Sequence, residues 1–215
     1  MLLVLASEWD RRGPLLRRRW ASADARVMTP RDLQRAGWRH EPERPSEGVA
    51  VAAGVAVRVG EIDGVCTLLP CVGEADLVEV RSVDRAYAAS EMTAFLCAWL
   101  DALDCPVTNP PTPSCLCGPA WSPERWRCAA AAAGLPTAQE AGTVVSVVGD
   151  QVFGAETAKQ GEVARRLARA TGLRTLRVTL GGPVSAPGVA TADLWLDAYD
   201  ARIADAARVL LEARP

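Results

Sequence analysis

The chain has 215 residues, a hydrophobic fraction of 49% and a formal net charge of −2 at pH 7. This length can bury a substantial core in one domain or two small ones. The near-neutral charge gives no electrostatic basis for nucleic-acid binding, and no apolar run reaches the roughly 18 residues of a membrane span. Residues 1–6 are apolar but too short for a signal sequence and lack a basic segment, so we expect a cytoplasmic protein.

Lysine and histidine are each represented by one residue, Lys159 and His40. Of the 24 lysine and arginine residues, 23 are therefore arginine (24 − 1). Chemistry that depends on a lysine ammonium group or an imidazole has one candidate of each. His40 lies in a charged segment that we expect to be an exposed loop, which gives a His-dependent mechanism little support.

The seven cysteines are odd in number and include no CxxC pair, which indicates reduced thiols rather than a disulfide framework. Cys115 and Cys117 form the only close pair, and their spacing matches no standard zinc site. Arg125 or Arg127 could activate one of these thiols. Metal binding and reactivity both stay open, and unreactive buried or loop thiols are the simpler interpretation.

Residues 1–103 alternate strand and helix patterns, as in an α/β fold. Thr29 followed by Pro30 marks a helix start. A long helix over residues 84–103 has an apolar stripe that includes Tyr87, Phe95 and Trp99. The other expected elements are strands at residues 1–6, 25–28 and 62–69, a short helix at 14–21 and a hairpin over 49–59.

Residues after 136 predict a second unit with the order strand, strand, helix, strand, strand, helix. Gly149 and Asp150 form the turn of its first hairpin, and Gly172 stops the first helix. Asp200 begins the last helix. The expected strands are residues 143–148, 151–154, 174–180 and 189–196, and the first helix covers 159–170.

Four segments follow one another in an informative order. They are the helix from Glu91 to Leu103, the run Val107-Thr-Asn-Pro-Pro111 after an expected strand at 105–108, the helix closing in Gly134-Leu135, and the strand pair Val147-Val-Gly-Asp-Gln-Val-Phe153. In this order and spacing they resemble the RimK-type, glutathione-synthetase-like branch of the ATP-grasp superfamily. The resemblance implies an α/β protein: a pre-ATP-grasp-like α/β unit at residues 1–120, packed in one compact body on a shortened ATP-grasp-like α+β unit at residues 121–215.

The chain departs from the family pattern where the family binds nucleotide and metal. Ser122-Pro123 stands where the resemblance places an Asn-Lys pair, and only residues 137–142 occupy the place of the lid and the lysine-bearing strands. Trp195 and Asp197 replace the Glu-x-Asn motif that holds magnesium. On one strand face, Asp193 and Asp197 would lie about 13 Å apart, too far for a shared cation. We therefore expect no ATP, no magnesium and no catalytic residue.

These departures favour a non-catalytic ATP-grasp-like pseudoenzyme that binds a protein or peptide partner, with no role for nucleic acid or membrane. By analogy with the family, such a protein would assist peptide modification or natural-product biosynthesis. Tryptophan and arginine are typical of interface hot spots. The candidate binding surface therefore comprises Asn109, Trp121, Arg125, Trp126, Arg127, Asp193, Trp195 and Asp197.

Three alternatives stay open. The tryptophans could simply fill the space left by the missing subdomain. The protein could be an enzyme, either an ATP-dependent carboxylate–amine ligase completed by a partner or dimer, or a repurposed site built on Asp197 or Cys115. It could also be a homodimer that serves only as a scaffold.

Overall fold

The computed structural model describes residues 1–213. The chain divides into two compact units, one formed by Met1–Gly118 together with the chain from Arg208 onwards, the other by Pro119–Ala207. The first unit ends two residues before the predicted boundary at 120, but the end of the last helix belongs to the first unit rather than the second. Within residues 1–213, no helix is long and apolar enough to span a lipid bilayer.

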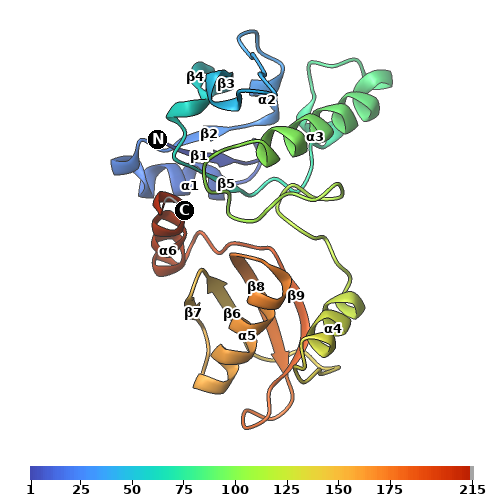
Figure 1. Ribbon diagram of the computed structural model, residues 1–215. Coiled ribbons are helices and arrows are strands. Elements are labelled where there is room, and N and C mark those ends of the chain that lie inside the picture. The colour runs from blue at the N-terminus through green and yellow to red at the C-terminus, as the bar shows by residue number, and fades with distance from the viewer. Residues whose placement is uncertain (214–215) are drawn as a thin grey trace. The chain divides into compact units, whose positions relative to one another are not determined.

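Three short parallel strands form the sheet of the first unit (Figure 1). They are β1 (Leu2–Leu5), β2 (Arg26–Met28) and β5 (Gly64–Thr67), in the order β2-β1-β5. All four residues of the central strand are buried, which explains why it is a continuous apolar run. The strands predicted over residues 1–6, 25–28 and 62–69 are confirmed.

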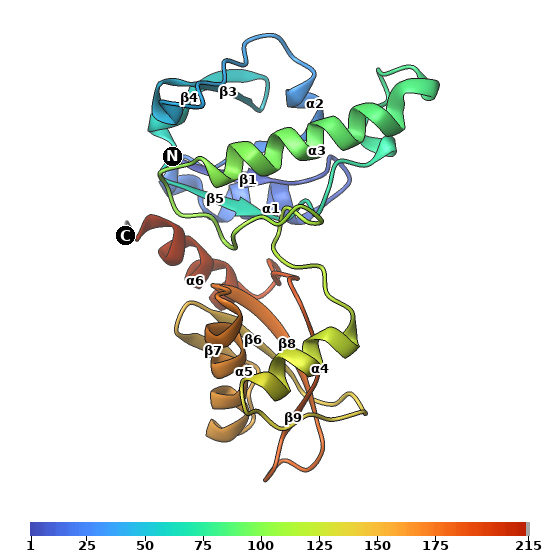
Figure 2. The same ribbon diagram turned by 45° about the vertical axis from the view of Figure 1, so that its right-hand side comes forward.

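Helices cover both faces of this sheet. The long helix α3 (Arg85–Asp101) packs its Leu96, Trp99 and Leu100 against Leu3 and Leu5 of β1, and Figure 2 shows it lying across the strands. On the opposite face, α1 (Arg12–Arg19) approaches closely at Gly13, where an added Cβ would lie 3.1 Å from the Ala6 Cβ. The C-terminal end of α6 (Ala201–Glu212) packs there too: a Cβ at Gly64 would lie 2.7 Å from the Leu211 carbonyl oxygen.

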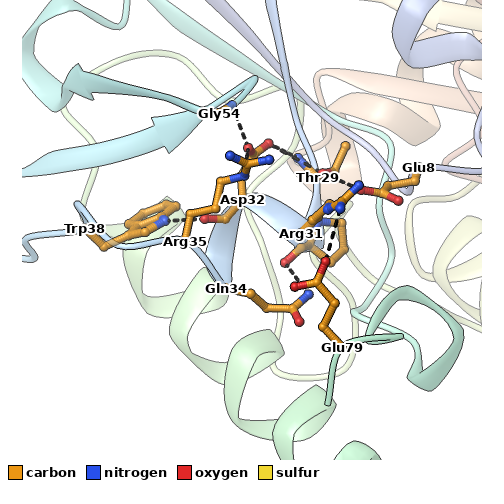
Figure 3. A network of polar contacts seen from close by, with 10 residues as sticks. Glu8, Thr29, Arg31, Asp32, Gln34, Arg35, Trp38, Gly54 and Glu79 are labelled. Carbon is orange, nitrogen blue, oxygen red and sulfur yellow. Dashed lines mark hydrogen bonds and ion pairs between the residues drawn. The ribbon is translucent and has the colours of Figure 1, made fainter.

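A buried aspartate joins the short helix α2 (Pro30–Leu33) to the hairpin of β3 (Val49–Ala52) and β4 (Val55–Arg58), as Figure 3 shows. Asp32 Oδ2 accepts the backbone N–H of Thr29 at 3.0 Å, which completes the predicted helix start. Its Oδ1 accepts the backbone N–H of Gly54 at 2.8 Å. Ala53 and Gly54 both have positive φ, as a two-residue turn of this hairpin requires.

The second unit is a four-stranded antiparallel sheet with the order β7-β6-β8-β9. Its strands are β6 (Val144–Val148), β7 (Gln151–Phe153), β8 (Thr175–Gly181) and β9 (Gly188–Asp193). Helices α4 (Pro123–Ala132) and α5 (Ala158–Thr171) pack on one face, where Trp126, Leu167 and Val178 share the core. The predicted β-β-α-β-β-α order is confirmed.

Three local predictions are wrong. Residues 105–108 form no strand, only an isolated parallel bridge between Val107 and Val65. Tyr87 was assigned to the apolar stripe of α3, but it lies in the first turn of the helix and is 72% exposed. The last strand ends at Asp193 rather than residue 196.

Candidate binding site on the second unit

An arginine and an aspartate face each other across the last two strands of the second unit. The ladder pairs Arg177 of β8 with Asp193 of β9. Because side chains alternate along a strand, Leu176 and Val178 point into the core while Arg177 points to the opposite face. The guanidinium donates to Asp193 Oδ2 from Nε at 2.9 Å and from Nη2 at 2.8 Å. Both side chains are partly exposed, so the pair contributes at most about 1 kcal/mol to stability.

The same aspartate fixes the tryptophan that follows the strand. Asp193 Oδ1 accepts the backbone N–H of Trp195 at 2.9 Å, which turns the chain at the strand end. The Trp195 ring lies near the guanidinium of Arg177, with 5.8 Å from Cζ to the ring centroid, and is 45% exposed. We call Arg177, Asp193 and Trp195 the Trp195 cluster. It presents an aromatic ring that is both accessible and held in place.

A second tryptophan–arginine group lies at the start of α4. Arg125 Cζ is 5.0 Å from the Trp121 ring centroid, and the Trp121 and Trp126 rings are 4.7 Å apart. Ser122 caps the helix by accepting the backbone N–H of Arg125. Arg127 Nη1 donates to the carbonyl oxygen of Ala190 in β9 at 3.1 Å, which ties the helix to the sheet. We call Trp121, Arg125, Trp126 and Arg127 the Trp121 cluster.

The two clusters lie on opposite faces of the sheet. Trp121 and Trp126 pack against the core between the sheet and its helices, together with Ala192 of β9. Asp193 is the next residue along β9 and therefore points to the other face. The predicted single surface is thus two separate surfaces.

Two predicted surface residues are buried. Trp126 is 1% exposed and belongs to the core of the second unit. Asn109 is 2% exposed and belongs to the first unit. Neither side chain can contact a partner in this conformation, which corrects their assignment to the binding surface.

The shared strand face predicted for Asp193, Trp195 and Asp197 is also wrong, because β9 ends at Asp193. The distance of about 13 Å inferred from an extended strand therefore does not apply. Asp197 instead accepts the backbone N–H groups of Tyr199 at 3.0 Å and Asp200 at 3.4 Å. It shapes the turn before α6.

The first unit has two cavities that were not predicted from the sequence. One, of about 390 Å³, is lined in part by Asp63, Asp104 and Cys105. The other, of about 330 Å³, is lined in part by Arg17 and Arg31.

No protein-family model and no curated protein matches the sequence. Solved structures match over nearly the whole chain at low identity. The macrocyclase MdnC from Microcystis aeruginosa MRC, bound with precursor peptide MdnA, has 10% identity and a TM-score of 0.69 over 99% of both chains. The ATP-grasp ligase PsnB, complexed with minimal precursor, Mg and ADP, has 12% identity and a TM-score of 0.71 over 99% of this chain and 98% of that one. A RimK-domain ATP-grasp protein from Sphaerobacter thermophilus DSM 20745 has 13% identity and a TM-score of 0.53 over 99% of both. The predicted ATP-grasp-like fold is confirmed.

The same structures overturn the prediction that ATP and magnesium play no part. PsnB was solved with Mg and ADP, and in another complex with AMPPNP. Missing lysines in this sequence were therefore an insufficient basis for excluding these groups.

Asp193 and Asp197 are the two carboxylates at and beside the position of the family's metal motif. In their present contacts they do not fit a magnesium ion. Asp193 is bonded to Arg177, and Asp197 accepts two backbone amides. Across residues 1–213, no three His, Cys, Asp or Glu side chains gather as a metal site. Lys159 Nζ donates to the carbonyl oxygen of Ser185 at 2.7 Å.

Proposed function

We propose that the protein binds a peptide through the Trp195 cluster and acts as a non-catalytic accessory protein in peptide modification. The observation that carries this proposal is the half-exposed Trp195 ring, held by Arg177 and Asp193. Three proteins of similar fold were solved with peptides: MdnC with its precursor peptide, PsnB with a minimal precursor, and a Chryseobacterium gregarium ligase with a leader and core peptide. Their identities of 9–12% mean that the residues of this chain must support the proposal themselves.

The chemistry of the cluster suits a peptide. Tryptophan and arginine are enriched among interface hot spots, and the tryptophan ring buries a large area with only two side-chain torsions to fix. Two hydrogen bonds and a main-chain contact already restrict the Trp195 cluster, which lowers the entropy lost on binding. Ser146, Thr179 and Thr191 lie half-buried on the same sheet face and can hydrogen-bond a peptide backbone.

The non-catalytic part of the proposal rests on the polar groups of the second unit. Phosphoryl transfer depends on positioned cations. The only lysine is engaged with the loop at Ser185, and the carboxylates at the end of β9 are engaged with Arg177 and with backbone amides. We place the protein in the cytoplasm, where its seven free thiols stay reduced.

Fluorescence anisotropy tests the proposal with labelled synthetic peptides, each copied from a short open reading frame next to the gene. We expect one of them to bind the wild type with a Kd in the micromolar range or tighter. Trp195→Ala should weaken this binding by roughly tenfold or more, since a hot-spot truncation costs over 1 kcal/mol. Trp9→Ala is the matched control, because Trp9 is an exposed tryptophan of the first unit.

Binding that is equal in wild type and Trp195→Ala would refute the proposed surface. Size-exclusion chromatography with light scattering, on the chain with and without the bound peptide, separates peptide binding from a scaffold role as a homodimer. A dimer that binds none of the peptides would support the scaffold.

The second candidate function is ATP-dependent carboxylate–amine ligation, which the ligases among the solved structures favour. Mass spectrometry of the bound peptide after incubation with Mg-ATP distinguishes it. Unchanged peptide mass supports the accessory role, whereas loss of one water per new bond shows ligation. Added partner proteins from the same gene neighbourhood test completion in trans.

A further inference from the structure

The cavity of about 330 Å³ in the first unit is lined by α1, by the segment around α2 and by the turn of the β3–β4 hairpin. Three arginines border it: Arg17 of α1, Arg31 of α2 and Arg35, which follows α2. Figure 3 shows the last two of them beside Thr29 and Asp32. The volume is within the range of about 300–1,000 Å³ that is usual for small-molecule sites. Guanidinium groups from two parts of the fold therefore border a space large enough for a ligand.

This part of the first unit is strongly basic. Residues 8–35 include eight arginines and four acidic residues, a net charge of +4 (8 − 4), although the whole chain has −2. Arg17, Arg18 and Arg19 of α1 are all exposed, and none of their side chains forms an ion pair or hydrogen bond within residues 1–213. A concave surface with an excess of one charge concentrates ligands of the opposite charge. The charge distribution therefore favours an anion at this cavity.

The three bordering arginines keep hydrogen-bond donors for a ligand. The Arg17 side chain has no partner in the described part of the chain. Arg31 donates from Nη2 to Glu79 Oε1 at 3.1 Å, and both side chains of this pair are more than half exposed. Arg35 Nε is 3.9 Å from Asp32 Oδ1, which is too long for a hydrogen bond. Because a guanidinium has five N–H donors, each of the three retains several for an anion.

The hairpin turn holds Arg35 in place. A Cβ added at Gly54 would lie 3.3 Å from Arg35 Nη1 and 3.5 Å from its Cζ, so the guanidinium lies directly against the glycine. Asp32 accepts the backbone N–H of Gly54 at 2.8 Å and fixes this turn. A donor that is already ordered loses less entropy when a ligand binds. Arg35 is therefore arranged for binding before a ligand arrives.

Two carboxylates also line the cavity, so its lining has three positive and two negative charges, a net charge of +1 (3 − 2). Asp32 is 5% exposed, and its two oxygens accept the backbone N–H groups of Thr29 and Gly54. Its charge is thus stabilised inside the fold. Glu8 is exposed and accepts only the Thr29 hydroxyl, at 3.5 Å. Since this contact is long, the Glu8 carboxylate can turn into water when an anion enters.

We propose that this cavity is a phosphate site, in which Arg17, Arg31 and Arg35 bind a free phosphate ion or the phosphate group of a small organic molecule. Guanidinium groups suit phosphate because their planar donors form paired hydrogen bonds with two oxygens. A carboxylate has two oxygens in one plane, whereas a phosphate group has three terminal oxygens that point in different directions. Arginines that approach from α1 and from the α2 segment match the second arrangement. The site uses no residue of the Trp195 cluster, so it is independent of the proposed peptide binding.

Isothermal titration calorimetry of the full-length protein tests the site with two probes, inorganic phosphate and glycerol 3-phosphate. The ionic strength is kept constant, because salt screens attraction between exposed charges. We expect saturable binding at one site per chain, with a Kd in the millimolar range or tighter. Tighter binding of the ester would identify a phosphorylated organic molecule as the ligand class, and equal binding would identify the phosphate ion. The absence of saturable binding of both probes up to about 10 mM would overturn the proposal.

Variants separate a phosphate site from general attraction to a basic helix. Arg17→Gln should weaken binding by roughly tenfold or more, since it removes a charged donor from the cavity. Arg19→Gln is the matched control: it removes the same charge from an exposed position of the same helix, outside the cavity lining, and should match the wild type within about twofold. Arg17 has no side-chain partner in the described chain, so its loss should leave the fold intact, which far-UV circular dichroism checks. Equal weakening by the two variants would overturn the proposal.

Discussion

Asp32 in the first unit and Asp193 in the second both lie near an arginine, but their surroundings differ. Asp32 in the first unit is 5% exposed, and its carboxylate accepts the backbone N–H groups of Thr29 and Gly54 (Figure 3). Its arginine, Arg35, is only a distant neighbour at 3.9 Å. Asp193 in the second unit is partly exposed, and its oxygens accept the Arg177 guanidinium and one backbone amide.

The difference shows how burial decides what a carboxylate does. A buried carboxylate must satisfy its acceptor capacity inside the fold, so Asp32 joins segments 22 residues apart in the chain. A partly exposed carboxylate loses little by staying in water, so Asp193 can orient a neighbouring aromatic side chain that faces solvent. The first arrangement stabilises the fold, and the second presents a contact surface.

The loss of unfolding free energy on truncation should differ most between a buried and an exposed tryptophan. Trp126→Ala should lower the free energy of unfolding by about 3–5 kcal/mol, because it leaves a cavity in the core of the second unit. Trp195→Ala should change it by less than about 1 kcal/mol. Urea denaturation followed by far-UV circular dichroism measures both. Equal losses would show that exposure does not separate their roles.

Asp32→Ala should lower the free energy of unfolding by about 2–3 kcal/mol, because two partly buried backbone donors lose their acceptor. Asp32→Asn is the matched variant and should lose less, since it retains one acceptor oxygen. The same urea titration applies. A loss at Asp32→Ala no greater than that at Asp193→Ala would contradict the structural role of the buried carboxylate.

Asp193→Ala should lower stability by about 1 kcal/mol or less, because its ion pair is screened by water. Its effect on peptide affinity should be larger, roughly tenfold in Kd, since Trp195 loses the contact that orients it. Fluorescence anisotropy gives the affinity and urea denaturation the stability. A large stability loss with unchanged affinity would show that Asp193 stabilises the fold and does not orient Trp195 for binding.

The smallest effect is expected at Asp200, before α6. Hydrogen bonds from the side chain and backbone of Arg202 lower the pKa of Asp200 to about 2. A carboxylate with a depressed folded-state pKa stabilises the fold above its unfolded pKa near 3.9, and this is lost as the pH falls through about 2. The difference in unfolding free energy between wild type and Asp200→Asn should be under about 1 kcal/mol at pH 5 and shrink towards pH 2. A difference that grows on acidification would contradict this sign.

Local signals in the sequence predicted most of the fold. Thr29, Pro30 and Asp32 specify a helix start through contacts within four residues, so the sequence contains the whole motif. The hairpin turn at Ala53 and Gly54 and the stop at Gly172 are equally local. The resemblance to the ATP-grasp fold came instead from the order and spacing of four segments between Glu91 and Phe153.

The site was less predictable because it depends on contacts that sequence spacing does not show. An alternating pattern extended the last strand to residue 196, but the Asp193 side chain binds the Trp195 amide and ends the strand. In the sequence Trp126 is next to Arg125 and Trp195 is two residues from Asp193, so both tryptophans lie close to a charged residue. Only the packing of α4 on the sheet shows that Trp126 faces the core.

The close approach of Gly64 to Leu211 affects how the chain can fold during synthesis. The second unit is formed by one continuous segment, Pro119–Ala207, and can fold as soon as that segment has left the ribosome. The sheet of the first unit is complete in sequence much earlier, but its strand β5 packs at Gly64 against Leu211 of α6, near the end of the described chain. During synthesis this apolar face would stay uncovered until the segment encoding the second unit has been translated. During synthesis, the first unit would therefore complete its folding after the second unit.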